Sequence, residues 1–186
     1  RSCIAFSIGP LYDALARHLM QKKDLGVHTP MFTDALMDLV KSGAVSNRYK
    51  ESFPGKSLTS YAIGTEDLMH WLDLNPLVEF QGIDKVFNPM YIGRNKRFVA
   101  IVNIRRVDLT GRIALHVGKG NIITDPSEVI DFVNGAEISE GGYTIFALPS
   151  RNLKGESNVR DSIEEVPNQL NVRGSVDLVV TEYGVA

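Results

Sequence analysis

The segment VHTPMFTD, residues 27–34, surrounds a proline with two side chains that could do chemistry. His28 could act as a general base or a ligand, and Asp34 could act as a catalytic acid. The alternatives, which we favour, are a structural histidine and an aspartate that complements the positive end of a helix. Pro30 lies where a strand pattern gives way to a helix pattern and has no reactive group.

Three further stretches could contact a ligand. SIGPL (7–11) predicts a strand-to-helix turn whose N–H groups could hold an anion, but its single glycine favours a plain connection. Gly141 and Gly142 could let a ligand approach the backbone, or could form a turn before a strand. Glu182 follows an apolar strand, at the edge where open sheets usually bind ligands, or it is an exposed loop residue.

Metal and nucleotide motifs are missing from the sequence. It contains no cluster of cysteine and histidine with zinc-ligand spacing, no Walker loop and no serine-hydrolase elbow. We therefore expect no bound metal.

Alternating strand and helix patterns in the first half would position these residues. Three β-prone runs each precede a helical pattern, namely residues 4–8 before 11–20, 25–28 before 33–42, and 57–64 before 65–74. Pro10 falls where a first-turn proline is tolerated, and Thr65 can cap its helix. Gly43 can end the second helix in a left-handed conformation.

The second half is richer in strands. Its β-prone runs are residues 98–104, 106–117, 143–150 and 176–180. Gly111 in DLTG can take the positive φ of a hairpin turn, and the polar stretches 48–57 and 151–174 predict loops. The whole pattern predicts an α/β fold with an open mixed sheet and flanking helices.

The overall composition excludes several functional classes. The chain has 186 residues, of which 44% are hydrophobic and 23% charged, as in an ordinary globular domain. Its net charge of −2 gives no case for nucleic acid, and no apolar run reaches the about 18 residues of a membrane helix. The single cysteine, Cys3, fits a reducing cytoplasm, where we expect a buried thiol. Both ends of the chain lie in strand patterns, which predicts that residues 1–186 are one domain excised from a longer protein.

Five segments in this order resemble the acetyl-CoA hydrolase/transferase family: HTPMFTDALMDLVKSGAVSN, IGTEDLMHWLDLNPLVEF, VDLTGRI, VIDFVNGAEISEGGYTIFALPS and VDLVVTEYGVA. They correspond to most of the C-terminal lobe of these CoA-transferases. The resemblance implies a CoA-transferase-like lobe that works with an N-terminal lobe of the same chain. It is also compatible with a homodimer. It also implies acyl-CoA and a small carboxylate as substrates, with no tightly bound cofactor.

The resemblance gives Pro30 its meaning. In the family a glutamate directly after a His-Thr or His-Ser pair attacks the acyl-CoA and becomes a glutamyl-CoA thioester. A second carboxylic acid then accepts the CoA from this intermediate, or water hydrolyses it. The matching position here is Pro30, which has no carboxylate.

The family's CoA-binding turns differ here as well. A turn resembling GIGGI matches Ser7, Ile8, Gly9, Pro10 and Leu11, in which Pro10 removes one N–H donor. A second loop, resembling GGQVDF, has Ser127 and Glu128 in place of two glycines, and Glu128 would place negative charge beside an oxyanion. By the same resemblance, the Gly141–Gly142 pair and Glu182, near the acyl-acceptor site, do match.

Three functional hypotheses remain. The first is an acyl-CoA-handling enzyme with a relocated nucleophile such as His28, Glu79 or Glu128. The second is a catalytically degenerate lobe that binds CoA or regulates an attached domain. The third is a scaffold lobe. Family membership favours the first hypothesis, and the residues at the three altered positions favour the second.

Overall fold

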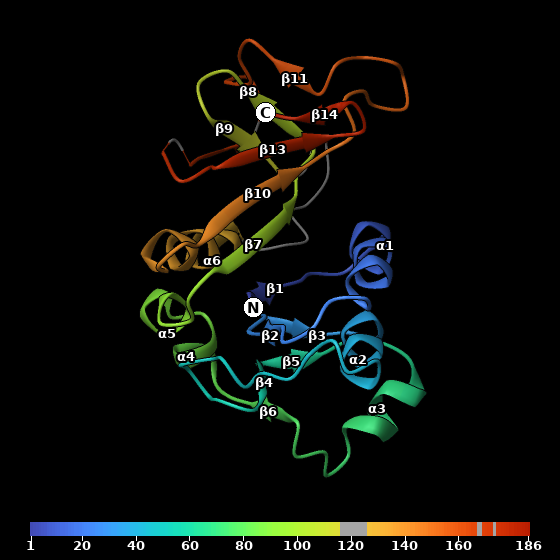
Figure 1. The fold of residues 1–186 in the computed structure, drawn as a ribbon. Helices are drawn as coiled ribbons and strands as arrows, with labels where there is room; N and C mark the ends of the chain where they lie inside the picture. The colour runs from blue at the N-terminus through green and yellow to red at the C-terminus, as the bar shows by residue number, and fades with distance from the viewer. Residues whose placement is uncertain (116–125, 167–168, 173) are drawn as a thin grey trace.

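A six-stranded sheet crosses the middle of the molecule, with helices on both faces (Figure 1). The structure, a computed structural model, describes residues 1–115, 126–166, 169–172 and 174–186, without the side chains of residues 126–128. In spatial order the six strands are β14 (Gly184–Val185), β13 (Leu178–Thr181), β10 (Tyr143–Ala147), β7 (Phe98–Asn103), β1 (Cys3–Ala5) and β2 (Gly26–Val27). Neighbours are parallel except β13 and β14. The expected α/β fold with an open mixed sheet is confirmed.

The remaining described strands form smaller sheets. One contains β11 (Val159–Arg160), β8 (Arg106–Asp108), β9 (Arg112–Ala114) and β12 (Gln169–Asn171). Two parallel pairs join β3 (Met31–Phe32) to β5 (Tyr61–Ala62), and β4 (Ser57–Thr59) to β6 (Val78–Phe80). The helices are α1 (Pro10–Leu19), α2 (Asp34–Lys41), α3 (Glu66–Leu72), α4 (Ile83–Val86), α5 (Pro89–Gly93) and α6 (Pro126–Ile138).

The two faces of the central sheet are covered by different helices. On one face, Ile4 and Val27 pack in a core with side chains of α1 and α2. On the other face, Phe98 and Ala100 pack with side chains of α5 and α6, and alternate residues of β7 are buried accordingly. A Cβ at Gly135 would collide with Ile92, so this glycine lets α6 approach α5 closely. No helix in the described part of the chain is long and apolar enough to cross a membrane.

Several local predictions are confirmed. Pro10 occupies the first turn of α1, and the Thr65 hydroxyl accepts a hydrogen bond from the Leu68 N–H as the cap of α3. Gly43 has φ 79° after α2, and Gly111 has φ 86° in the turn between β8 and β9. Each glycine therefore takes a backbone conformation that other residues rarely adopt.

Two strand predictions and one loop prediction were wrong. The run 4–8 leaves the sheet after Ala5, because the Thr29 hydroxyl donates to the Phe6 carbonyl at 2.6 Å and accepts from the Phe6 N–H at 3.1 Å. The run 57–64 divides into β4 and β5, which pair with different strands. The predicted loop 151–174 contains β11 and β12, which pair with β8 and β9.

Asp108 fixes the hairpin between β8 and β9. Its buried carboxylate accepts hydrogen bonds from the N–H groups of Thr110, Arg112 and Ile163 at 2.9–3.2 Å, and from the Thr110 hydroxyl. Burial by itself would raise the pKa of this carboxyl, but the hydrogen bonds outweigh it and lower the pKa to about 2. The ionised side chain therefore holds the turn together at neutral pH.

Replacement of Asp108 by asparagine is expected to reduce the free energy of unfolding at pH 7 by about 2–3 kcal/mol. The carboxyl has its folded pKa below the unfolded value of about 3.9, so its contribution is complete above that pH and is lost as the pH falls toward 2. Urea unfolding at several pH values between 7 and 2 measures both effects. Asp38→Asn, at an exposed site on α2, is the control, and equal losses in the two variants would contradict the prediction.

Candidate functional site

The strand order of the central sheet reverses between β1 and β7. From β1 the chain crosses to β2 on one side, whereas from β7 it continues to β10 and then β13 on the other side. In open α/β sheets, ligands bind in the crevice outside the carboxyl ends of the strands at such a switch point. A pocket with a volume of about 220 Å³ lies there.

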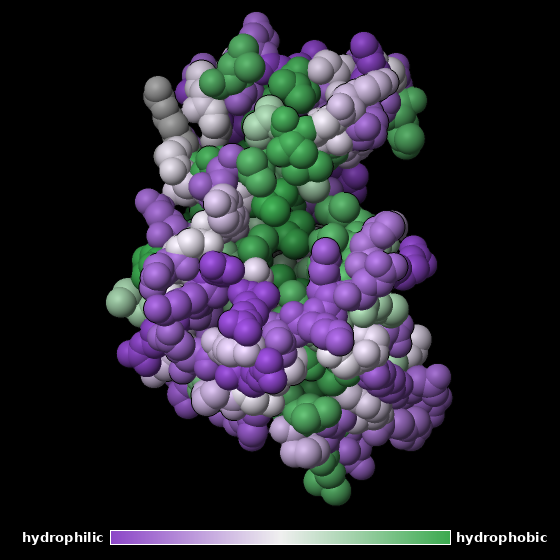
Figure 2. Space-filling model, in the orientation of Figure 1, coloured by the Kyte–Doolittle hydropathy of each residue, from purple (hydrophilic) through white to green (hydrophobic). Residues whose placement is uncertain are grey.

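The pocket has mostly apolar walls and few polar groups. It is lined by Ala5, Phe6, Ser7, Ile8, Tyr12, Pro30, Ala100, Ile101, Val102, Asn103, Arg105, Leu115, Val129 and Phe132. Figure 2 shows apolar surface across the middle of the molecule, where Figure 1 places β7, β10 and β13. The described lining contains no carboxylate, imidazole, thiol or amine. Its polar side chains are a hydroxyl, a phenol, an amide and a guanidinium.

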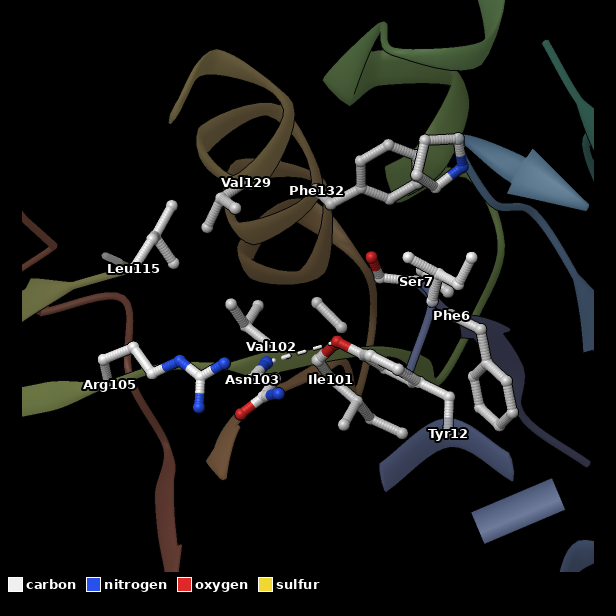
Figure 3. Close-up of a pocket in the computed structure, with 14 residues that line it drawn as sticks. Phe6, Ser7, Tyr12, Ile101, Val102, Asn103, Arg105, Leu115, Val129 and Phe132 are labelled. Atoms are coloured by element: carbon white, nitrogen blue, oxygen red, sulfur yellow. Dashed lines mark hydrogen bonds between the residues drawn. The ribbon is translucent and has the colours of Figure 1, made fainter. Parts of the chain in front are cut away.

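Tyr12 closes the floor of the pocket. Its hydroxyl donates to the Ile101 carbonyl at 3.0 Å and accepts from the Asn103 N–H at 3.2 Å, which ties α1 to the end of β7 (Figure 3). Burial raises the pKa of Tyr12 to about 12, so the phenol is neutral at physiological pH. Sequence reasoning missed Tyr12, although a tyrosine on the apolar face of a predicted helix is a signal for a buried hydroxyl with a partner.

The turn before α1 forms one wall of the pocket. Gly9 has φ 127° and ψ 173°, a conformation open essentially only to glycine, and its carbonyl accepts from the Tyr12 N–H. Ser7 and Ile8 line the pocket, whereas Gly9, Pro10 and Leu11 do not. Of the five residues predicted to contact CoA here, two therefore face the pocket.

Pro30 lies in the wall of the pocket. It is buried, and its carbonyl accepts hydrogen bonds from the Ser60 N–H and the Thr59 hydroxyl, both at 3.2 Å. These bonds fix the backbone between β2 and β3. The side chain presented to the pocket at this point is a pyrrolidine ring.

His28 has a structural role, and the prediction that favoured this role is confirmed. Its Nε2–H donates to the Val86 carbonyl at 2.8 Å, and its Nδ1 accepts from the Asn95 amide at 3.2 Å. Burial, reinforced by the charge of Lys50, lowers the pKa of His28 to about 3. With both ring nitrogens engaged and no exposed surface, His28 cannot exchange protons with a substrate.

Asp34 also joins structural elements. Its carboxylate accepts from the N–H and the hydroxyl of Thr65, linking the start of α2 to the cap of α3. Glu79, considered as a substitute nucleophile, is paired with Lys56 at 2.7 Å and accepts from Gln81. Neither carboxylate lines the pocket.

Glu182 lies in the turn after β13, at the same edge of the sheet as the pocket but outside its lining. It accepts from the Ser150 hydroxyl at 2.6 Å and from the Ser150 N–H at 2.8 Å. These bonds lower the pKa of Glu182. The side chain is therefore an ionised, oriented carboxylate beside β10.

The remaining predicted contacts are placed differently. Gly141 and Gly142 precede β10, at the amino edge of the sheet, and a Cβ at Gly142 would collide with the Ala136 carbonyl. This placement agrees with the turn that the sequence left open, and the pocket includes neither glycine. Ser127 and Glu128 lie in the first turn of α6, before the lining residue Val129, and their side chains are outside the described structure. No group of three potential ligands suited to a metal occurs in the described residues.

Comparison with known proteins gives a consistent picture. The profile of the acetyl-CoA hydrolase/transferase C-terminal domain matches residues 64–186. Over 184 residues the chain is 36% identical to the 4-hydroxybutyrate coenzyme A transferase of Clostridium kluyveri, covering 98% of this chain and 43% of that protein. It is 33% identical to the succinyl-CoA:cyclohexane-1-carboxylate CoA transferase of Geobacter metallireducens, again covering 43% of that protein.

Solved structures show the same fold. The 4-hydroxybutyrate CoA-transferase of Porphyromonas gingivalis superposes with a TM-score of 0.85 at 35% identity, and RipA of Yersinia pestis with 0.88 at 29% identity. Each match covers all of this chain, but only 43% and 41% of the respective solved chains. This chain therefore spans less than half the length of these relatives.

Proposed function

Because the chain belongs to the acetyl-CoA hydrolase/transferase family, we propose that it binds an acyl-CoA without forming a glutamyl thioester at residue 30. The observation that carries this proposal is Pro30 in the wall of the switch-point pocket. The pocket is where an α/β sheet binds its ligand, and the residue there lacks the carboxylate that the resemblance requires.

The polar groups of the pocket can hold a thioester but are poorly suited to attack it. Ser7 has no histidine or other base in the described lining that could take its proton, and Tyr12 is a neutral phenol whose hydroxyl is already bonded. Asn103 and Arg105 offer hydrogen-bond donors. Covalent catalysis needs an activated nucleophile, so these residues support binding and orientation.

A relocated nucleophile finds little support among the described side chains. His28 is fully bonded, and Glu79 is paired away from the pocket. Glu182 is the acid that the resemblance places near the acyl-acceptor site. It is hydrogen-bonded to Ser150 and lies outside the pocket lining. A misplacement of about 1 Å can cost on the order of a hundredfold in rate, so an acid elsewhere at this edge is a weak substitute.

The chain's partners are proposed from its relatives. It covers 43% of the Clostridium kluyveri transferase, and we propose that residues 1–186 form a C-terminal lobe that works with an N-terminal lobe of the same protein. We further propose acyl-CoA as the ligand and a small carboxylate as the second substrate, and a homodimer as the assembly compatible with this lobe.

Calorimetric titration with acetyl-CoA tests the proposed function. Binding of one acetyl-CoA per chain is expected. Ile8→Glu is expected to weaken it about tenfold at low salt, because this exposed residue lines the pocket and its negative charge would repel the phosphates of CoA.

Ile8→Gln, of similar size but neutral, is the matched control and should bind within about twofold of the unsubstituted chain. An absence of binding, or equal affinities for both variants, would overturn the proposal. A thermal melt of each variant confirms that the fold is intact.

A further inference from the structure

Arg105 is the only cation among the described residues of the pocket wall. It follows β7, and its N–H donates to the Ala114 carbonyl at 2.7 Å, which fixes its backbone beside β9. The side chain is exposed, and no described residue forms an ion pair or hydrogen bond with its guanidinium. By contrast, the neighbouring Arg106 lies 3.9 Å from Glu156. A guanidinium without such a partner among the described residues, at the rim of an apolar pocket, can bind an anion.

The surroundings of Arg105 indicate the kind of anion. Figure 3 shows Arg105 at the opposite side of the pocket from Ser7, with the Tyr12 hydroxyl between them. Leu115 and Val129 lie along the same wall as Arg105, and Val102 lies between Arg105 and Phe132. A ligand whose anionic group pairs with Arg105 would therefore place its other atoms against hydrocarbon.

The volume limits the size of that ligand. A pocket of about 220 Å³ holds the equivalent of roughly seven waters of liquid, at about 30 Å³ each. It is smaller than the pockets of about 300–1,000 Å³ that take drug-sized molecules. It suits a small organic acid or the acyl end of an acyl-CoA.

We propose that Arg105 is a specificity-determining residue that selects small acids in which a hydrocarbon body carries a free carboxylate. The guanidinium presents a planar pair of N–H donors that matches a carboxylate, and the apolar walls exclude water from the hydrocarbon. The inference rests on the proposed function, because it concerns the acid that shares this pocket with an acyl-CoA.

Binding of benzoate and of benzamide to the 186-residue chain tests the charge requirement directly. The two molecules have nearly the same shape, but only benzoate is an anion. We expect benzoate to bind about tenfold more tightly than benzamide, and more tightly than acetate, which lacks the hydrocarbon body. Calorimetry or ligand-observed NMR measures the three affinities.

Variants then locate the effect. Arg105→Gln should weaken benzoate about tenfold and leave benzamide unchanged, and Arg105→Lys should retain part of the benzoate affinity. Arg17→Gln, at an exposed position on α1, makes the same chemical change elsewhere and should alter neither ligand. Because both arginines are exposed, neither change removes packing from the core.

Three outcomes would overturn the proposal. They are equal affinities for benzoate and benzamide, no benzoate binding at about 10 mM, and a benzoate affinity that Arg105→Gln leaves unchanged. If Arg105→Gln instead weakens CoA and not benzoate, the guanidinium binds a phosphate and the proposal is also wrong. Failure of acetyl-CoA binding with Arg105-dependent benzoate binding would count against the proposed function alone.

Discussion

Pro30→Glu is expected to accumulate a covalent CoA adduct when incubated with acetyl-CoA, whereas the unsubstituted chain accumulates none. The introduced carboxylate would attack the thioester carbonyl and release the CoA thiolate, leaving a mixed anhydride. The thiolate would then attack the glutamyl carbonyl and release acetate, which leaves a glutamyl-CoA thioester. The backbone at residue 30 is already fixed by bonds from Thr59 and Ser60 to its carbonyl, so the new side chain starts from an ordered position.

Mass spectrometry of the intact protein measures the adduct, and borohydride reduction followed by peptide mapping locates it. Pro30→Gln is the matched control, because it has the size of glutamate without the nucleophilic carboxylate. An adduct on an acidic residue of the unsubstituted chain would refute the proposal that this site is silent. Failure of Pro30→Glu to react would show that residue 30 does not present its side chain to the thioester.

Asn95→Ala is expected to lower the free energy of unfolding by about 3 kcal/mol or more. The Asn95 side chain is fully buried, accepts from the Ser52 N–H at 3.1 Å and donates to His28 Nδ1. Alanine would leave buried partners without hydrogen bonds, which costs more than the bonds themselves contribute. Because His28 is two residues before Pro30, the same change should loosen this wall of the pocket.

Chemical denaturation of Asn95→Ala and the unsubstituted chain gives the difference in stability. Asn134→Ala, at an exposed position on α6, is the control and should be neutral or slightly stabilising because alanine favours helix. A loss below about 1 kcal/mol for Asn95→Ala would show that water or a neighbouring group replaces the amide. Identical chemical shifts of the His28 ring in NMR spectra of the two proteins would show that the histidine keeps its environment and would contradict the loosened pocket wall.

Local sequence patterns predicted much of the fold's first half. The helices after Pro10, Thr33 and Thr65 are signalled by apolar spacing and capping residues, which act within a few residues of the chain. The strand at 98–104 was equally clear, because its run is long and β-prone. Helices α4, α5 and α6 were not predicted from the pattern, since α4 and α5 are short and α6 is interrupted by Gly135.

The sequence by itself determined the family and the α/β class, and it predicts that residue 30 lacks the family's carboxylate, because these depend on residue identity and order. Only the tertiary structure decided which residues share the pocket. Asn103 and Arg105 are distant along the chain from Pro30 and line the same pocket because parallel strands bring their carboxyl ends to one edge. Tyr12 reaches this pocket from α1, and Leu115 reaches it from the end of β9. The tertiary structure also showed that His28 is fully buried, and that Gly141 and Gly142 lie at the amino edge of the sheet, opposite the pocket. Burial and strand order are properties of the packed sheet, and no local run of residues contains them.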